Sequence, residues 1–174
     1  VENCGDVILF DNVRHKLTVT CVSLHKDSLR RHLLAVPARE VVENDWADLY
    51  AWRNDPATRE AFFSTDPVEI QEHLAWLEKA LKNDAILLLI ATDHSSSISV
   101  GMLRFDRVKS DWSCSIAVDP NHRGRGIGTE LLQQGLSFVE DRLTEGGRIV
   151  AQIKDTNYAS LRLFSSAGFT SCLA

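Results

Sequence analysis

Short stretches in which hydrophobic residues predominate open the chain, and polar turn residues separate them, as is typical of β-strands. Residues 6–10 and 17–24 are two such stretches, and the turn residues between them favour a β-hairpin. Residues 33–42 form a third stretch, in which Pro37 is typical of an edge strand or of the start of a strand. We therefore expect the chain to begin with β-structure.

Two amphipathic helices are predicted after these strands. Asn44 or Asp45 is the expected N-cap of the first helix, which carries its aromatic residues on one face and ends before Asp55-Pro56. Asp66-Pro67 marks the start of the second helix, in which hydrophobic residues recur at three- and four-residue steps as far as Leu81.

The hydrophobic period changes after residue 85, where three strand-length runs follow one another. Residues 85–92 are continuously apolar, whereas residues 98–107 and 111–118 mix apolar and polar positions. Because the polar connections between the runs are short, they predict an antiparallel meander of three strands.

A helix, a strand and a last helix complete the pattern. Hydrophobic residues trace one helix face over residues 131–143, and Gly146-Gly147 ends that helix. Residues 148–153 form a strand, and a helix joins it to the strand at residues 111–118, so we expect the two to be parallel neighbours. The final helix spans residues 157–168.

The order of these elements predicts an α/β fold with a mixed sheet, in which an antiparallel meander precedes a parallel β-α-β unit. At 174 residues and 19.5 kDa, the chain has the length of one domain with a sizeable core. We expect an N-terminal extension over residues 1–30 and a single domain over residues 31–174.

A glycine-rich turn joins the third strand of the meander to the next helix. Glycines allow backbone N–H groups to turn toward a ligand, and a helix N-terminus attracts anions, so the turn is suited to a pyrophosphate. Gly128 is followed by Thr129-Glu130 rather than by Lys and Ser or Thr, which excludes the phosphate loop of nucleotide hydrolases. Thr129 also stands where a dinucleotide-binding motif requires glycine. The alternative is a tight turn without a ligand.

The motif Arg123-x-x-Gly126-x-Gly128 resembles the acyl-CoA loop of the GCN5-related N-acetyltransferase (GNAT) family. Two further motifs, in the expected order, support this resemblance. Residues 157–169 are similar to the family's Asn-x-x-Ser helix that ends in Gly-Phe. The segments 52–56 (Trp-Arg-Asn-Asp-Pro) and 73–76 (His-Leu-Ala-Trp) resemble the branch that modifies ribosomal-protein N-termini or nucleotide-linked amino sugars.

The resemblance implies acetyl-CoA as co-substrate and no metal. The loop amides, with the side chain of Arg125, would hold the pyrophosphate. The end of the preceding strand would pair with the pantetheine arm, and the last helix would contact that arm or the diphosphate. The residues so implied are Ile116, Ala117, Val118, Arg123, Gly124, Arg125, Gly126, Ile127, Gly128, Thr129, Asn157 and Ser160.

The implied reaction is attack of a deprotonated amine on the thioester, which needs a proton acceptor and a donor to the oxyanion, such as the N–H of Val118. Phe164 stands where relatives often carry a tyrosine that protonates the leaving thiolate. Residues 113–115 offer no glutamate base. His73 and Tyr158 are the remaining candidates for proton transfer, although residues in such positions more often have a structural or surface role.

Four residues are candidates for contact with the acceptor. Trp52 and Trp76 would floor its pocket, unless they are core residues at helical spacing. Arg53 belongs to the same motif as Trp52. Arg104 would bind a phosphate and the neighbouring Asp106 an amine, unless the two form an exposed ion pair.

Charge and composition limit the partners. A net charge of −5 and a pI of about 5.7 argue against a general nucleic-acid surface. The four cysteines lack metal-ligand spacing, and no apolar window is long enough for a membrane span, which favours a cytoplasmic protein with reduced thiols. The expected acceptor is a primary amine, either of a nucleotide-activated amino sugar or of a protein N-terminus. A catalytically silent acyl-CoA-binding regulatory module is the alternative from another class.

The end of the chain departs from the family pattern. Only residues 170–174 follow Gly168-Phe169, so the C-terminal strand of the family is expected to be missing. Residues 17–24 are the hypothetical replacement, either within the chain or by exchange in a homodimer.

Overall fold

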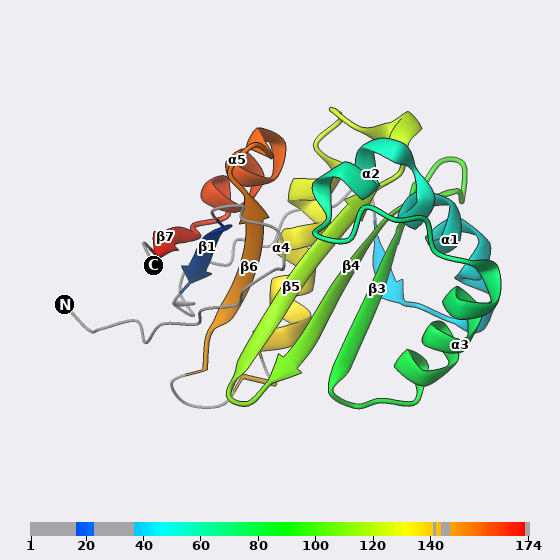
Figure 1. Cartoon of the computed structure of the whole chain (residues 1–174), viewed down its shortest axis with the longest axis horizontal. Coiled ribbons are helices and arrows are strands. Elements are labelled where there is room, and N and C mark those ends of the chain that lie inside the picture. The colour runs from blue at the N-terminus through cyan, green and yellow to red at the C-terminus, as the bar shows by residue number, and fades with distance from the viewer. Residues whose placement is uncertain (1–16, 23–36, 141, 144–146, 173–174) are drawn as a thin grey trace.

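The structure, a computed structural model, describes residues 17–22, 37–140, 142–143 and 147–172. It is a seven-stranded mixed sheet in the order β2-β3-β4-β5-β6-β1-β7, with helices on both faces (Figure 1). The strands are β1 (Leu17–Val22), β2 (Ala38–Glu40), β3 (Ile86–Thr92), β4 (Ser99–Val108), β5 (Asp111–Val118), β6 (Ile149–Lys154) and β7 (Thr170–Cys172). The α-helices are α1 (Trp46–Asn54), α2 (Pro56–Ala61), α3 (Ile70–Leu81), α4 (Ile127–Glu140) and α5 (Tyr158–Ser166), with 3₁₀ turns at Glu43–Asp45 and Pro120–His122.

The predicted meander is confirmed, because β3, β4 and β5 pair antiparallel in sequence order. Alternate residues of β3 enter two different cores. Leu87 and Leu89 pack with α4 on one face, whereas Leu88 and Ile90 pack with α1 and α3 on the other. A strand buried on both faces has no polar side to alternate with, which explains its continuously apolar sequence.

β5 and β6 are parallel neighbours, as the connecting helix predicts, but they pair over a short length. The register joins Trp112 to Ile149 and Ser113 to Val150. β5 nevertheless continues to Val118 and β6 to Lys154. The two strands therefore separate beyond Ser113, and a slot opens between their C-terminal halves.

The sheet continues beyond β6 through a strand from the start of the chain. β1 pairs antiparallel with β6 over Leu17–Val22 and with β7 on its other edge. Residues 17–22 thus add a strand within the chain, beside β7 and not in place of it. The expected absence of a C-terminal strand is wrong, since Thr170–Cys172 form β7, which is only three residues long. The hairpin with residues 6–10 lies outside the described residues, and the boundary after residue 30 stays a prediction.

The first two predicted helices hold with shifted ends, and one further helix was not predicted. Asp45 precedes α1, but its carboxylate accepts from the N–H of Val42 instead of capping that helix. The second predicted helix begins at Ile70, three residues beyond Asp66-Pro67. The Asp-Pro pair at Asp55-Pro56 predicts only the end of the first helix. In the structure it also begins α2, because Asp55 caps this helix by accepting from the N–H of Thr58 at 2.8 Å.

Candidate functional site

The glycine loop has the backbone geometry of an anion site. Gly124 and Gly126 lie in the left-handed region, with φ of +76° and +82°. The carbonyl of Gly126 accepts from the N–H groups of Thr129 and Glu130 at 3.0 and 3.1 Å, which starts α4. The next two amides, of Ile127 and Gly128, have no acceptor within the helix, as in any first turn. They stand free for a ligand at the positive end of the helix dipole.

Gly128 serves a different purpose, the close approach of two helices. A Cβ built on Gly128 would lie 2.6 Å from Cδ1 of Leu163 in α5. The absence of a side chain therefore brings α5 against the first turn of α4, so that both helices border the slot.

The slot between β5 and β6 is a cavity of about 770 Å³. Its walls come from α2, β5, the glycine loop, β6 and α5. The N–H of Trp112 donates to the carbonyl of Arg148 across the slot's closed end at 2.8 Å. Since strand amides alternate in direction, those of Ile116 and Val118 face the same way, where β6 has separated and offers no acceptor. Both amides are available to a bound chain.

Among the CoA-binding residues expected from the sequence, all but Arg125 line this cavity. Arg125 is exposed and makes no hydrogen bond or ion pair with the described residues. Asn157 caps α5, since its Oδ1 accepts from the N–H of Ser160 at 3.1 Å. The expected donor residues are thus brought together.

The side chain of Arg123 contacts the start of α2. Its Nη2 donates to Oδ2 of Asp55 and to Oγ1 of Thr58, both at 2.7 Å, and its Nε donates to the carbonyl of Val118 at 3.3 Å. The adjacent His122 is hydrogen-bonded to Asp119. Sequence reasoning placed Arg123 in the loop but gave no sign of its bond to α2.

Two aromatic residues of α5 have opposite surroundings. Tyr158 is 67% exposed and does not line the cavity. Phe164 lines the cavity, is 3% exposed and packs edge-on against Phe169 with ring centroids 4.8 Å apart. The aromatic residue of α5 that lines the slot therefore carries no hydroxyl, and the exposed Tyr158 is not part of the lining.

His73 lies in the second core and not in the cavity lining. It is 3% exposed, and its ring lies 5.4 Å from the rings of both Tyr50 and Trp76. Burial lowers the pKa of His73, and its Nε2 has no hydrogen-bond partner among the described residues. Trp52, at 4% exposed, belongs to the same core. The structure gives both residues packing roles and brings neither to the slot.

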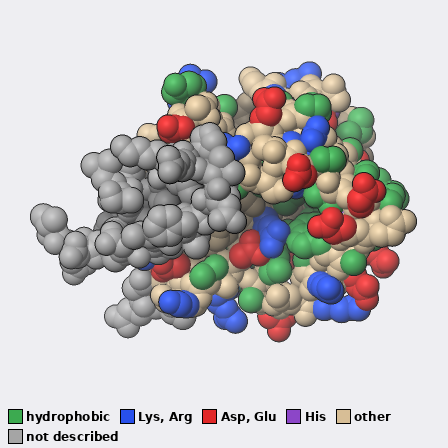
Figure 2. Space-filling model, viewed as in Figure 1, with side chains coloured by type: hydrophobic (Ala, Val, Ile, Leu, Met, Phe, Trp, Pro, Cys, Tyr) green, Lys and Arg blue, Asp and Glu red, His purple; other side chains and the backbone are tan. Residues whose placement is uncertain are grey.

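Two arginines on this side of the sheet lie over aromatic rings. Arg53 lies 5.2 Å from the ring centroid of Phe62 and Arg104 lies 5.2 Å from that of Trp76. Arg104 also donates to Oδ1 of Asp106 at 2.6 Å, so the two form an ion pair, although this pair is half-buried and not exposed as expected. Basic and acidic side chains lie side by side near the middle of the face that Figure 2 shows.

The Arg104–Asp106 pair is adjacent to the slot. In the β4–β5 register, Ser115 stands opposite Arg104 and Ser113 opposite Asp106. Directly opposite residues share one face of a sheet, and both serines line the cavity. The pair therefore lies one strand away from the slot, on the face that α1 and α3 partly cover.

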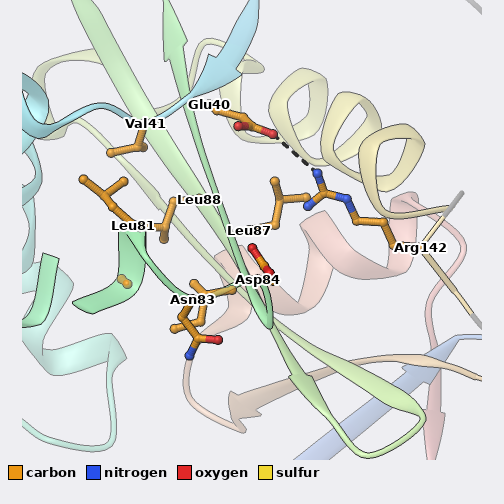
Figure 3. Close-up of a pocket in the computed structure, with 10 residues that line it drawn as sticks. Glu40, Val41, Leu81, Asn83, Asp84, Leu87, Leu88 and Arg142 are labelled. Carbon is orange, nitrogen blue, oxygen red and sulfur yellow. Dashed lines mark hydrogen bonds and ion pairs between the residues drawn. The ribbon is translucent and has the colours of Figure 1, made fainter. Parts of the chain in front are cut away.

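A second cavity, of about 400 Å³, lies at the edge of the sheet between α3 and the C-terminal end of α4 (Figure 3). The ion pair between Arg142 and Glu40, 3.4 Å long, crosses it. None of the site residues predicted from the sequence lines it, so the slot remains the candidate site.

Metal and thiol chemistry find no support in the described part of the chain. No group of three or more His, Cys, Asp or Glu side chains is arranged there to hold a metal. Burial, with a smaller effect of Asp106, raises the pKa of the Cys114 thiol, so that this cysteine remains protonated. No described helix has the length and apolarity that crossing a membrane requires.

The acetyltransferase (GNAT) domain model matches residues 38–170. The chain belongs to this family. The ribosomal-protein-alanine N-acetyltransferase from Brucella melitensis has a similar structure, with a TM-score of 0.68 and 26% identity, over 79% of this chain and 86% of that one. The structure of yncA from Salmonella typhimurium, determined with acetyl-CoA, is also similar, with a TM-score of 0.66 and 25% identity, over 79% of this chain and 80% of that one.

A curated relative matches a shorter region of this GNAT chain. The N-alpha-acetyltransferase RimI of Mycobacterium tuberculosis (strain ATCC 25618 / H37Rv) is 40% identical over 55 residues, which is 32% of this chain and 32% of the relative's own length. The family, the α/β fold class and the acyltransferase class predicted from the sequence are thereby confirmed.

Several residues of the GNAT site were missed by sequence reasoning. The cavity is also lined by α2 and the segment after it, including Thr58, Phe62 and Phe63, and by Gln152 of β6. Asp55-Pro56 is a helix-start signal that could have revealed α2. Gln152 has no such signal, because its place follows from the separation of β5 and β6.

Proposed function

We propose that this chain transfers the acetyl group of acetyl-CoA to the α-amine at the N-terminus of a protein. The donor half rests on one observation, the slot between β5 and β6 that ends at the glycine loop. Beyond Ser113, backbone groups of β5 that have no partner in β6 can pair with a pantetheine chain. The left-handed glycines of the loop suit the diphosphate that follows this chain. The relatives from Mycobacterium tuberculosis and Brucella melitensis support the choice of acceptor.

The residues that would hold the donor are those that the sequence predicts. Amides of residues 126–128 would bind the diphosphate, with the side chain of Arg125 as a nearby positive charge. The amides of Ile116 and Val118 would pair with the pantetheine arm or polarise the acyl oxygen, while Asn157 and Ser160 border the arm from α5. The amine nitrogen would bond to the acetyl carbonyl carbon, the C–S bond would then break, and coenzyme A would leave as a thiolate that takes up a proton from water.

The acceptor must approach from the α1–α3 side of the sheet, because α4 and α5 fill the other face. We place the amine near Asp106, because Arg104 bonds to its Oδ1 and leaves Oδ2 to accept from an N–H, with Ser113 on the strand between Asp106 and the slot. Asp106 and the serine hydroxyls would then orient the amine. No carboxylate is among the described residues that line the cavity, so the amine would pass its proton to Asp106 on this face through a water molecule.

A nucleotide-activated amino sugar, the acceptor expected first from the sequence, is the weaker choice. It requires a second basic phosphate site, but the Arg104–Asp106 ion pair has no net positive charge with which to bind a phosphate. The named relatives give no support for such a substrate. A protein N-terminus needs only an amine site that is open at one side.

The test measures release of the CoA thiol with short peptides that begin with alanine, and mass spectrometry locates the acetyl group. A peptide of the same sequence with a formylated N-terminus is the matched control. We expect turnover with the free α-amine alone. Turnover only with an amino-sugar nucleotide would overturn the acceptor assignment, and CoA binding without turnover on any amine would favour a regulatory acyl-CoA-binding module.

A further inference from the structure

α2 lies beside the C-terminal end of β5 (Figure 1), lines the slot and is hydrogen-bonded to residues at the ends of both strands that form it. At its start, Arg123, which follows β5, donates to Asp55 and Thr58. At its end, Nζ of Lys154, the last residue of β6, donates to the carbonyl of Glu60 at 2.7 Å. The helix is therefore held to each rim of the slot by a separate cation.

The hydrogen bond between Arg123 and Asp55 belongs to a small network that links the glycine loop to α2. Asp55 accepts from the guanidinium, from the N–H of Thr58 and from its hydroxyl, so one carboxylate both caps α2 and holds Arg123. Burial alone would raise the pKa of Asp55. The hydrogen bonds from Arg123 and Thr58 lower this pKa by more than burial raises it, so the pKa lies below its usual value. The Asp55 side chain is 19% exposed, which limits screening by solvent.

The same arginine also reaches the donor strand. Its Nε donates to the carbonyl of Val118, the last residue of β5, and its own backbone begins the glycine loop. One side chain thus links the end of β5, the loop and the first turn of α2. The nearby Arg125 makes none of these bonds.

We propose that Arg123 is a positioning residue that transmits occupancy of the donor loop to α2, the wall on the acceptor side of the slot. This inference rests on the proposed function, since it assumes that coenzyme A binds the loop. The Arg123 side chain is committed to Asp55 and Thr58 and is not a ligand of the diphosphate. Binding at the loop amides holds Arg123 in place, and Arg123 in turn holds α2 over the slot.

The first test is amide hydrogen exchange with and without saturating coenzyme A, which needs no acceptor. In the wild type, we expect CoA to slow exchange about fivefold or more both in the loop, residues 123–129, and in α2, at the amides of residues 57–61. In Arg123→Gln, CoA should slow exchange in the loop alone. Arg125→Gln is the matched control, because at saturating CoA it should retain the protection of both segments.

Asp55→Asn tests the same hydrogen bond by changing its acceptor. Asparagine still caps a helix but carries no charge for Arg123. We expect it to reproduce the loss of α2 protection, and the double variant with Arg123→Gln should be no worse than either single one. Independent, additive losses would mean that the two residues do not act through each other, and would overturn the inference.

The kinetic readout separates this role from donor binding. With an alanine-initiated peptide, Arg123→Gln should raise the KM for the peptide about tenfold and change the KM for acetyl-CoA little, whereas Arg125→Gln should do the reverse. If CoA protects neither segment of the wild type, the proposed function fails. If α2 remains protected by CoA in Arg123→Gln, the positioning role fails while the donor site stands.

Discussion

Gly135 of α4 faces Leu103 of β4 so closely that a Cβ on Gly135 would lie 2.0 Å from Cδ2 of Leu103. The same Cβ would lie 3.0 Å from Cε2 of Phe105. Both neighbours are fully buried in the core beneath the slot. This glycine therefore sets how near α4 lies to the sheet, and with it the position of the loop at the start of α4.

Gly135→Ala is expected to destabilise the protein by about 1–3 kcal/mol, because the core must move to admit the methyl group. Helix propensity alone predicts the opposite sign, a gain of about 1 kcal/mol. Urea unfolding measures the difference, and Ser137→Ala, on the exposed side of α4, is the control with little expected effect. A stabilised Gly135→Ala variant would contradict the close packing.

Gly126→Ala is expected to weaken CoA binding about tenfold while the chain remains folded. A left-handed φ of +82° costs a residue with a Cβ about 1–2 kcal/mol, so the turn will shift and misdirect the amides of the first turn. Calorimetric titration with coenzyme A measures the affinity. Asn121→Ala, an exposed position of the preceding 3₁₀ turn, should bind as the wild type does. Equal affinities of the two variants would argue against binding at this loop.

The sheet core and the donor loop could be predicted from the sequence because their signals are local. β3 is a continuous apolar run, and the turn before α4 concentrates glycines where φ must be positive. β1 is different, since its place between β6 and β7 depends on pairing with strands more than 100 residues away. No local pattern specifies such a partner.

The acceptor side was less predictable for the same reason. Trp52 and His73 have the spacing of a helix face, and spacing alone does not say whether that face meets a core or a pocket. In the structure, both side chains are buried in the core. The bond of Arg123 to Asp55 joins residues 68 positions apart, so its role follows only from the folded chain.

Phe164→Tyr is expected to raise kcat severalfold, because a phenol at this lining position offers a proton to the leaving thiolate. Some stability will be lost, about 1–3 kcal/mol, if the buried hydroxyl finds no partner. Steady-state kinetics at saturating substrates measures the change, and Phe169→Tyr, its buried packing neighbour outside the cavity lining, is the control. An unchanged kcat in a folded Phe164→Tyr variant would show that thiolate protonation does not limit the rate.

Asp45→Asn is expected to cost about 1–2 kcal/mol at neutral pH, because Asp45 accepts from Arg39 and from the N–H of Val42. The hydrogen bond from Arg39 is the main cause of the lowered pKa of Asp45. This stabilisation is therefore present above the unfolded value of 3.8 and is lost as pH falls through the lower folded value. Denaturant unfolding from pH 7 to 3 should show the two proteins converging below about pH 4. A gap that is as large at pH 3 as at pH 7 would mean that the charge is not responsible.

His73→Phe separates a packing role from a catalytic one. Burial lowers the pKa of His73 below 6.5, so on acidification the unfolded chain takes up the proton before the native one does. The wild type should therefore lose stability relative to His73→Phe as pH falls below 6.5, by at most about 1.4 kcal/mol for each pH unit. The other histidines cancel in this difference. Because His73 lies outside the cavity lining, kcat/KM at pH 7 should stay within about threefold of the wild type. A loss of about 100-fold, with folding and CoA affinity intact, would instead restore the proton relay expected from the sequence.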